Sequence, residues 1–162
     1  MMATPETKNK LDKNIQKTEK ILRKAAEFDL YESAKRFVAD EMGEKGYRIS
    51  KSRLENLSRA FSLSYDMFNK LLNNYLIRLQ REAEETRGAR EVNAKRELDI
   101  LKEIKVQCSL DILKGIPLGL EEPISRAERK EQSKLKKEYT GELARAWFTH
   151  FVSAYMFGEL SW

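Results

Sequence analysis

Apolar residues recur at helical spacing along this chain from Leu11 to Phe157. No stretch alternates apolar and polar residues in the manner of a half-buried strand. Only seven Gly and three Pro occur among 162 residues, so long elements can run without interruption. The length suits one domain or two small ones. We therefore expect an all-α fold.

Helix start and stop signals divide the chain into segments. Thr4-Pro5 is typical of a helix N-terminus, and capping boxes, in which Ser or Asp is followed three residues later by Glu, begin at Asp29, Ser52 and Ser125. Stop signals are expected at Gly43 and Gly46, a kink near Gly88, and a loop over 116–123 that contains two prolines. The last helix starts at Ser125, and its first half, from Arg126 to Glu138, has almost no apolar face.

The segment from Leu57 to Leu71 resembles a helix-turn-helix over about 20 residues. In this interpretation each position has a role: Ser58 is the small residue at the crossing, Ser62 the turn, Leu63 the apolar plug, Ser64 the cap of the second helix, and Phe68 and Leu71 its anchors. A plain helix hairpin has the same spacing, and both interpretations stay open. The fold expected is thus helix-turn-helix-like N-terminal helices followed by long helices in a bundle or hairpin.

Charge is concentrated around this segment. Residues 45–81 hold eight basic side chains against two acidic ones, whereas residues 25–44 hold two basic against six acidic. Arg and Lys bind phosphates, and Asn pairs with adenine in the major groove. The residues expected to contact DNA are Arg48, Lys51, Arg53, Arg59, Tyr65, Asn69, Lys70 and Asn73. As the alternative, these residues are ordinary solvated surface.

Aromatic residues of the last helix occupy more than one of its faces. A helix that is apolar nearly all round is either buried on all sides or meets a partner. Those proposed for a partner surface are Trp147, Phe148, Phe151 and Tyr155. The alternatives are the core of this protein, an oligomer surface or insertion into a membrane surface.

The sequence gives little support for a metalloprotein, an enzyme, a secreted protein or a membrane protein. Cys108 and His150 are the only Cys and His, so no multi-cysteine metal site is expected, and both residues are interpreted as core. We expect no metal, no cofactor and no enzymatic activity. No secretory signal is recognised, and the longest uncharged stretch is shorter than the roughly 18–20 residues that span a bilayer. A cytoplasmic protein without membrane contact is expected.

Three regions follow: a basic N-terminal helix or arm over 1–27, a helix-turn-helix-like DNA-binding region over 28–87, and a helical support or oligomerisation region over 88–162. The function expected is that of a small basic protein that self-associates on double-stranded DNA, either a helix-turn-helix regulator or a DNA-processing accessory factor. The alternative is a non-enzymatic helical adaptor, inhibitor or assembly factor that binds a protein partner through its aromatic C-terminal helix. RNA binding is a third hypothesis, without an aromatic single-strand platform to support it.

Overall fold

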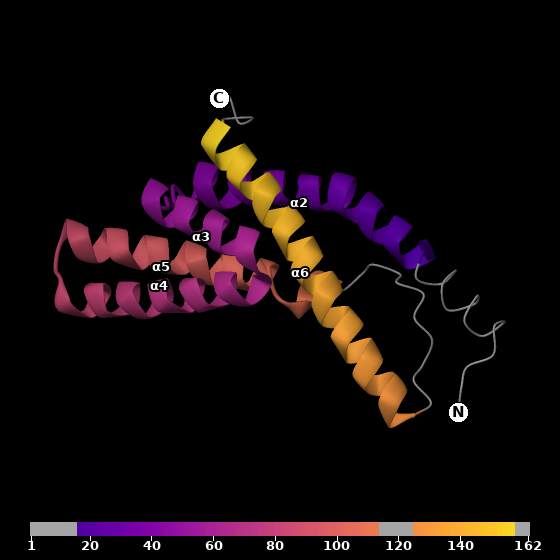
Figure 1. Ribbon diagram of the computed structural model, residues 1–162. Coiled ribbons are helices and arrows are strands. Elements are labelled where there is room, and N and C mark those ends of the chain that lie inside the picture. Colours follow the sequence, from indigo (N-terminus) through magenta and orange to yellow (C-terminus); the bar gives the residue numbers. More distant parts are fainter. Residues whose placement is uncertain (1–15, 114–124, 158–162) are drawn as a thin grey trace.

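The computed structural model describes residues 16–113 and 125–157, and within these ranges it contains helices and no strand (Figure 1). The all-α prediction is confirmed. The N-terminal start at Thr4-Pro5 and the proline loop over 116–123 lie outside the described residues.

The first helical run extends from residue 16 to residue 44 without a break. It contains a π-helical stretch η1 (Ala25–Asp29), the α-helix α2 (Leu30–Phe37) and a second π-helical stretch η2 (Val38–Glu44). The predicted start at Asp29 is wrong, because Asp29 has helical angles (φ −68°, ψ −42°) and its side chain caps nothing. The expected boundary between residues 27 and 28 therefore falls inside a continuous helix.

Two side chains from outside the first run bind carbonyls in its π-helical stretches. The Nε2 atom of His150 lies 2.8 Å from the carbonyl oxygen of Ala26, and the guanidinium of Arg48 donates to the carbonyl oxygen of Met42 at 2.7 Å. The run ends where expected, since Gly46 has a φ of +73°, which glycine adopts without strain.

Helices α3 (Lys51–Leu63) and α4 (Tyr65–Glu85) are joined by a single extended residue, Ser64. Ser64 caps α4 as predicted, because its side chain accepts a hydrogen bond from the N–H of Met67. The cap of α3 is Ser50, which accepts from the N–H of Arg53, and not the predicted Ser52.

The two helices run antiparallel as a hairpin. The amide of Asn56 donates to the hydroxyl of Tyr75 at 3.2 Å. In a helix-turn-helix with a crossing angle of about 90–120°, positions this far from the turn would be about 20 Å apart. Two expected roles are wrong: Ser62 lies inside α3, and Leu63, the expected plug, is 73% exposed.

Helix α5 (Ala89–Gln107) reverses direction at Gly88 and packs along α4. Gly88 has a φ of +71°, so the chain makes a full reversal here in place of the expected kink. The hydroxyl of Tyr65 at the start of α4 donates to the carbonyl oxygen of Cys108 after the end of α5. A short 3₁₀ helix, η3 (Leu110–Leu113), follows and packs against α6.

The last helix, α6 (Arg126–Phe157), crosses the other elements with its second half (Figure 1). The ring of Trp147 lies 5.2 Å from that of Phe37 in α2, and the ring of Phe148 lies 5.1 Å from that of Phe68 in α4. Phe61 of α3 stacks on Phe68 at 3.9 Å. These aromatic contacts join segments that are far apart in the sequence into one core.

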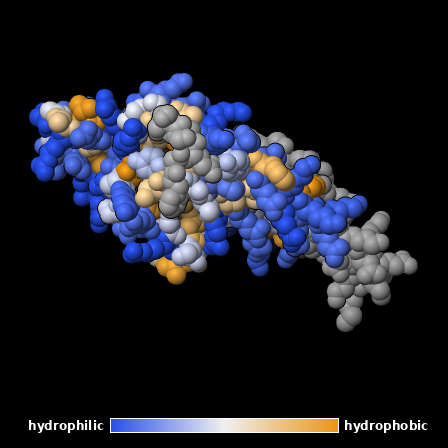
Figure 2. Space-filling view, turned by 90° about the horizontal axis from the view of Figure 1, so that it is seen from above, coloured by the Kyte–Doolittle hydropathy of each residue, from blue (hydrophilic) through white to orange (hydrophobic). Residues whose placement is uncertain are grey.

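On the face seen from above, apolar residues form separate small patches among hydrophilic ones (Figure 2). Among the described residues visible on this face, there is no large continuous apolar surface of the kind that marks many protein interfaces. Within the described part of the chain, no helix combines the length and the apolar character that crossing a bilayer requires.

Two leucines of α3 test the hairpin against the helix-turn-helix. Leu57 is fully buried, whereas Leu63 is 73% exposed. We expect Leu57→Ala to lower the free energy of unfolding by about 2–5 kcal/mol, and Leu63→Ala to change it by no more than about 0.5 kcal/mol. Urea unfolding followed by circular dichroism measures both. A comparable loss for Leu63→Ala would show that this side chain is buried as a plug, against the hairpin.

Candidate nucleic-acid interface

The first half of α6 extends away from the other helices as an arm (Figure 1). We define the arm as residues 126–138. Ser125 begins it as predicted, since its hydroxyl accepts a hydrogen bond from the N–H of Glu128 at 3.2 Å. All of its side chains are exposed except those of Gln132 and Leu135, which are half-buried. The arm therefore presents its side chains to solvent along more than three helical turns.

Basic and acidic residues of the arm lie on opposite faces. At about 100° per residue, its basic side chains fall within an arc of about 160°. We call them the basic stripe: Arg126, Arg129, Lys130, Lys134, Lys136 and Lys137. The three acidic residues Glu128, Glu131 and Glu138 flank Leu135 on the opposite side, and Leu135 packs against the core. The arm thus carries a continuous positive surface along one side.

Contacts at the base of the arm show which way the basic stripe faces. The ammonium of Lys137 lies 3.5 Å from the carboxylate of Asp66 in the first turn of α4. One turn further along α6, a Cβ built at Gly141 would lie 3.3 Å from Tyr65, and Arg145 donates to the carbonyl oxygen of Phe61 at 2.7 Å. The stripe therefore lies on the side of α6 that turns toward the start of α4.

Lys70 adds a cation on α4, one helical turn beyond Asp66. It is exposed and lies four residues after Asp66, so the two side chains share one face of the helix. An open cleft of about 450 Å³ lies between the two helices, and charges of both signs line it: Asp66, Glu138 and Glu142 together with Lys137 and Arg145. The basic stripe and Lys70 thus border the same corner of the molecule.

Three of the residues predicted to contact DNA are held by contacts inside the protein. Arg48 donates to the carbonyl oxygens of Met42 and Tyr47. Tyr65 is half-buried against α6, and burial raises the pKa of its hydroxyl above the usual value. Arg53 forms an ion pair, described next. None of these three side chains is free to reach a nucleic acid without breaking an internal contact.

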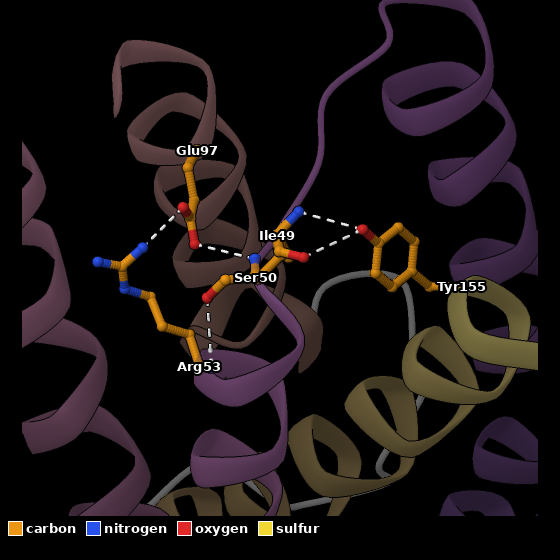
Figure 3. Close-up of polar contacts among 5 residues, drawn as sticks. All are labelled: Ile49, Ser50, Arg53, Glu97 and Tyr155. Carbon is orange, nitrogen blue, oxygen red and sulfur yellow. Dashed lines mark hydrogen bonds and ion pairs between the residues drawn. The ribbon is translucent and has the colours of Figure 1, made fainter. Parts of the chain in front are cut away.

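Arg53 belongs to a polar cluster that fixes the segment before α3 (Figure 3). Its guanidinium lies 2.7 Å from one carboxylate oxygen of Glu97 in α5, and the other oxygen accepts from the N–H of Ser50 at 3.1 Å. The hydroxyl of Tyr155 bonds both the N–H and the carbonyl oxygen of Ile49 at 3.2 Å. The segment between η2 and α3 is thereby tied to α5 on one side and to α6 on the other.

The other predicted DNA contacts lie on the outside. Lys51, Arg59, Lys70 and Asn73 are exposed, and Asn69 is half-buried. Lys51 pairs with Glu55 at 4.0 Å, which places it on the outer side of α3. Of these residues, Lys70 lies one helical turn after Asp66, whose carboxylate pairs with Lys137 of the arm.

The four residues predicted for a partner surface lie within the fold. Trp147 and Phe151 are fully buried and Phe148 is 2% exposed. The indole N–H of Trp147 donates to the hydroxyl of Ser33 at 3.3 Å. Tyr155 is half-buried and holds Ile49. These side chains thus lie in or against the core of the protein, which is one of the alternatives that the sequence left open.

The described residues contain no candidate metal-binding cluster. No group of three or more His, Cys, Asp or Glu side chains there is arranged to hold a metal ion. Cys108 is buried, and burial raises the pKa of its thiol far above the ordinary value, which keeps it protonated. His150 is half-buried and contacts the ring of Tyr31 edge-on at 5.4 Å.

The sequence reasoning missed the basic stripe. The net charge of whole segments does not reveal it, because the basic and acidic residues of 126–138 separate only around the helix. The signal is present in the spacing of Arg126, Arg129, Lys130, Lys134 and Lys137, which recur at three- and four-residue intervals.

Comparison of this chain with protein-family models, with curated proteins and with solved structures finds no match. The candidate interface therefore depends on the geometry alone.

A double-mutant cycle tests whether the ion pair between Arg53 and Glu97 stabilises the fold. We expect Arg53→Gln and Glu97→Gln to show a coupling free energy of about 1 kcal/mol or more in urea unfolding, because the pair is partly buried and shares Ser50.

The exposed pair Lys51 and Glu55 on α3, the helix that holds Arg53, lies 4.0 Å apart and is the matched control. It should show a coupling of about 0.3–0.5 kcal/mol. Equal couplings in the two cycles would contradict a structural role for Arg53.

Proposed function

We propose that this protein is a non-enzymatic DNA-binding protein that contacts the phosphate backbone of duplex DNA through the basic stripe of α6 and Lys70. The observation that carries the proposal is the arm itself: an exposed helix that has its cations on one face and turns that face toward α4. The helix-turn-helix mode expected for residues 57–71 is not part of the proposal, because α3 and α4 form a hairpin.

The dimensions of the arm suit a duplex. Its stripe runs for about 16 Å, and a helix with its side chains is about 10–12 Å wide. The major groove of B-form DNA is about 12 Å wide. Such a helix can lie in or along the groove with phosphates on both sides.

The charge of the stripe gives a driving force for binding. Lys137 pairs with Asp66, and no ion pair within the described part of the chain neutralises the other five cations of the stripe. The pair at Lys137 is exposed and so contributes little to stability. Each cation that neutralises a phosphate releases a counterion, which makes the affinity depend steeply on salt.

Self-association remains a prediction from the sequence. The basic stripe is complete within one chain, so the proposed binding does not require a second copy. Light scattering with and without DNA measures the stoichiometry.

A salt series tests the proposal. We expect a labelled duplex of mixed sequence to bind with an affinity that falls linearly with log salt concentration. Replacing Arg129 and Lys130 together by Gln should lower the magnitude of this slope by about 1.8, since each phosphate contact contributes about 0.9. Fluorescence anisotropy titrations between low and moderate salt give both values.

The matched control removes the same charge elsewhere. Arg90 and Arg96 are exposed on α5. Their joint replacement by Gln should leave the slope nearly unchanged. Equal effects of the two double variants would mean that net charge alone drives binding, and absence of salt-dependent binding by the original protein would refute the proposal.

A further inference from the structure

The outward face of α4 adjoins the basic stripe and carries polar and apolar groups as well as cations. Lys70, Asn73, Asn74, Ile77 and Arg81 are all exposed, and Ile77 is 54% exposed. At about 100° per residue they fall within an arc of about 100°, which also includes Asp66 and Glu84. We call these five residues the α4 face.

The remainder of α4 is committed to the core. Phe68 and Leu72 are buried together with Tyr75, Leu79 and Ala83. The α4 face lies opposite these side chains, so a partner can approach it without any rearrangement of the hairpin. Its first residue, Lys70, lies one turn from the contact between Asp66 and Lys137, where the basic stripe ends.

We infer that the α4 face reads base edges in the major groove while the basic stripe holds the backbone, so that the protein prefers sites containing A·T pairs. This inference rests on the function proposed above. Asn accepts and donates to adenine in a bidentate pair, apolar groups contact the thymine methyl, and Arg and Lys pair with guanine. The α4 face holds two adjacent Asn residues and an exposed Ile between Lys70 and Arg81, which is the set of groups that such readout uses.

The side-chain chemistry of the α4 face favours a duplex over other nucleic acids. A-form RNA has a deep, narrow major groove that side chains cannot read. Single strands are bound by stacking on aromatic side chains, and the α4 face contains none. B-form DNA is therefore the partner that fits both the Asn residues and the stripe.

Selection from a duplex library with a randomised centre tests the inference. The original protein should enrich sites that contain consecutive A·T pairs. The variant Asn73→Ala with Ile77→Ala should lose this enrichment, with the affinity ratio between the best site and a scrambled site falling by about 5- to 150-fold. Its salt slope should stay unchanged, because neither residue binds phosphate.

Two controls distinguish a loss of sequence preference from a general loss of affinity. Asn93→Ala, at an exposed position of α5, should keep the preference. The stripe variant Arg129→Gln with Lys130→Gln should lower affinity for the best and the scrambled site equally and keep their ratio. Circular dichroism confirms that each variant is folded.

The outcomes distinguish the inference from the proposed function. Salt-dependent binding of all duplexes with equal affinity overturns the inference and leaves the proposed function standing. Equal affinity for double-stranded RNA also overturns the inference. Absence of binding to any duplex overturns both.

Discussion

The packing of the second half of α6 against the helices α2, α3 and α4 is the interaction on which the rest of the structure depends. Trp147 contacts Phe37 of the first helical run, while Phe148 contacts Phe61 and Phe68 of the α3–α4 hairpin. Aromatic side chains bury about 150–250 Å² each and supply much of the energy of a small core. Because one helix makes all of these contacts, its axis sets the relative positions of the other elements.

The same axis sets the direction of the arm. Burial ends toward Leu135, which is half-buried, and of the residues before it in the arm all but the half-buried Gln132 are exposed. The ion pair between Lys137 and Asp66 marks the junction, but both side chains are largely exposed, so packing and not this pair fixes the geometry. A solvated basic helix is thus presented at a fixed angle to α4, and the position of the candidate interface follows from the core.

Several helix caps and helix ends could be predicted from the sequence, because contacts between residues close in the sequence determine them. Ser64 and Ser125 cap helices as expected, and Gly46 ends the first run. The antiparallel packing of α3 and α4 could not be predicted from the sequence, because the spacing of residues from Leu57 to Leu71 is the same for a hairpin and for a helix-turn-helix. The hairpin depends on distant contacts, among them Phe148 on Phe61 and the hydrogen bond from Asn56 to Tyr75.

The internal partners of Arg53 and Tyr65 could not be predicted either, and both residues were therefore expected to contact DNA. These partners, Glu97 and Cys108, come more than 40 residues later in the sequence. The basic stripe was missed because charge was counted along the chain and not around the helix.

The most direct test of the central claim is a titration of ¹⁵N-labelled protein with a short DNA duplex at low salt, followed by two-dimensional NMR. The largest shift changes should map to residues 126–137 and to the outward side of α4, with α5 unaffected. Changes confined to the outer side of α3 around Lys51 and Arg59, or no changes at all, would contradict the claim that the arm of α6 forms the binding surface.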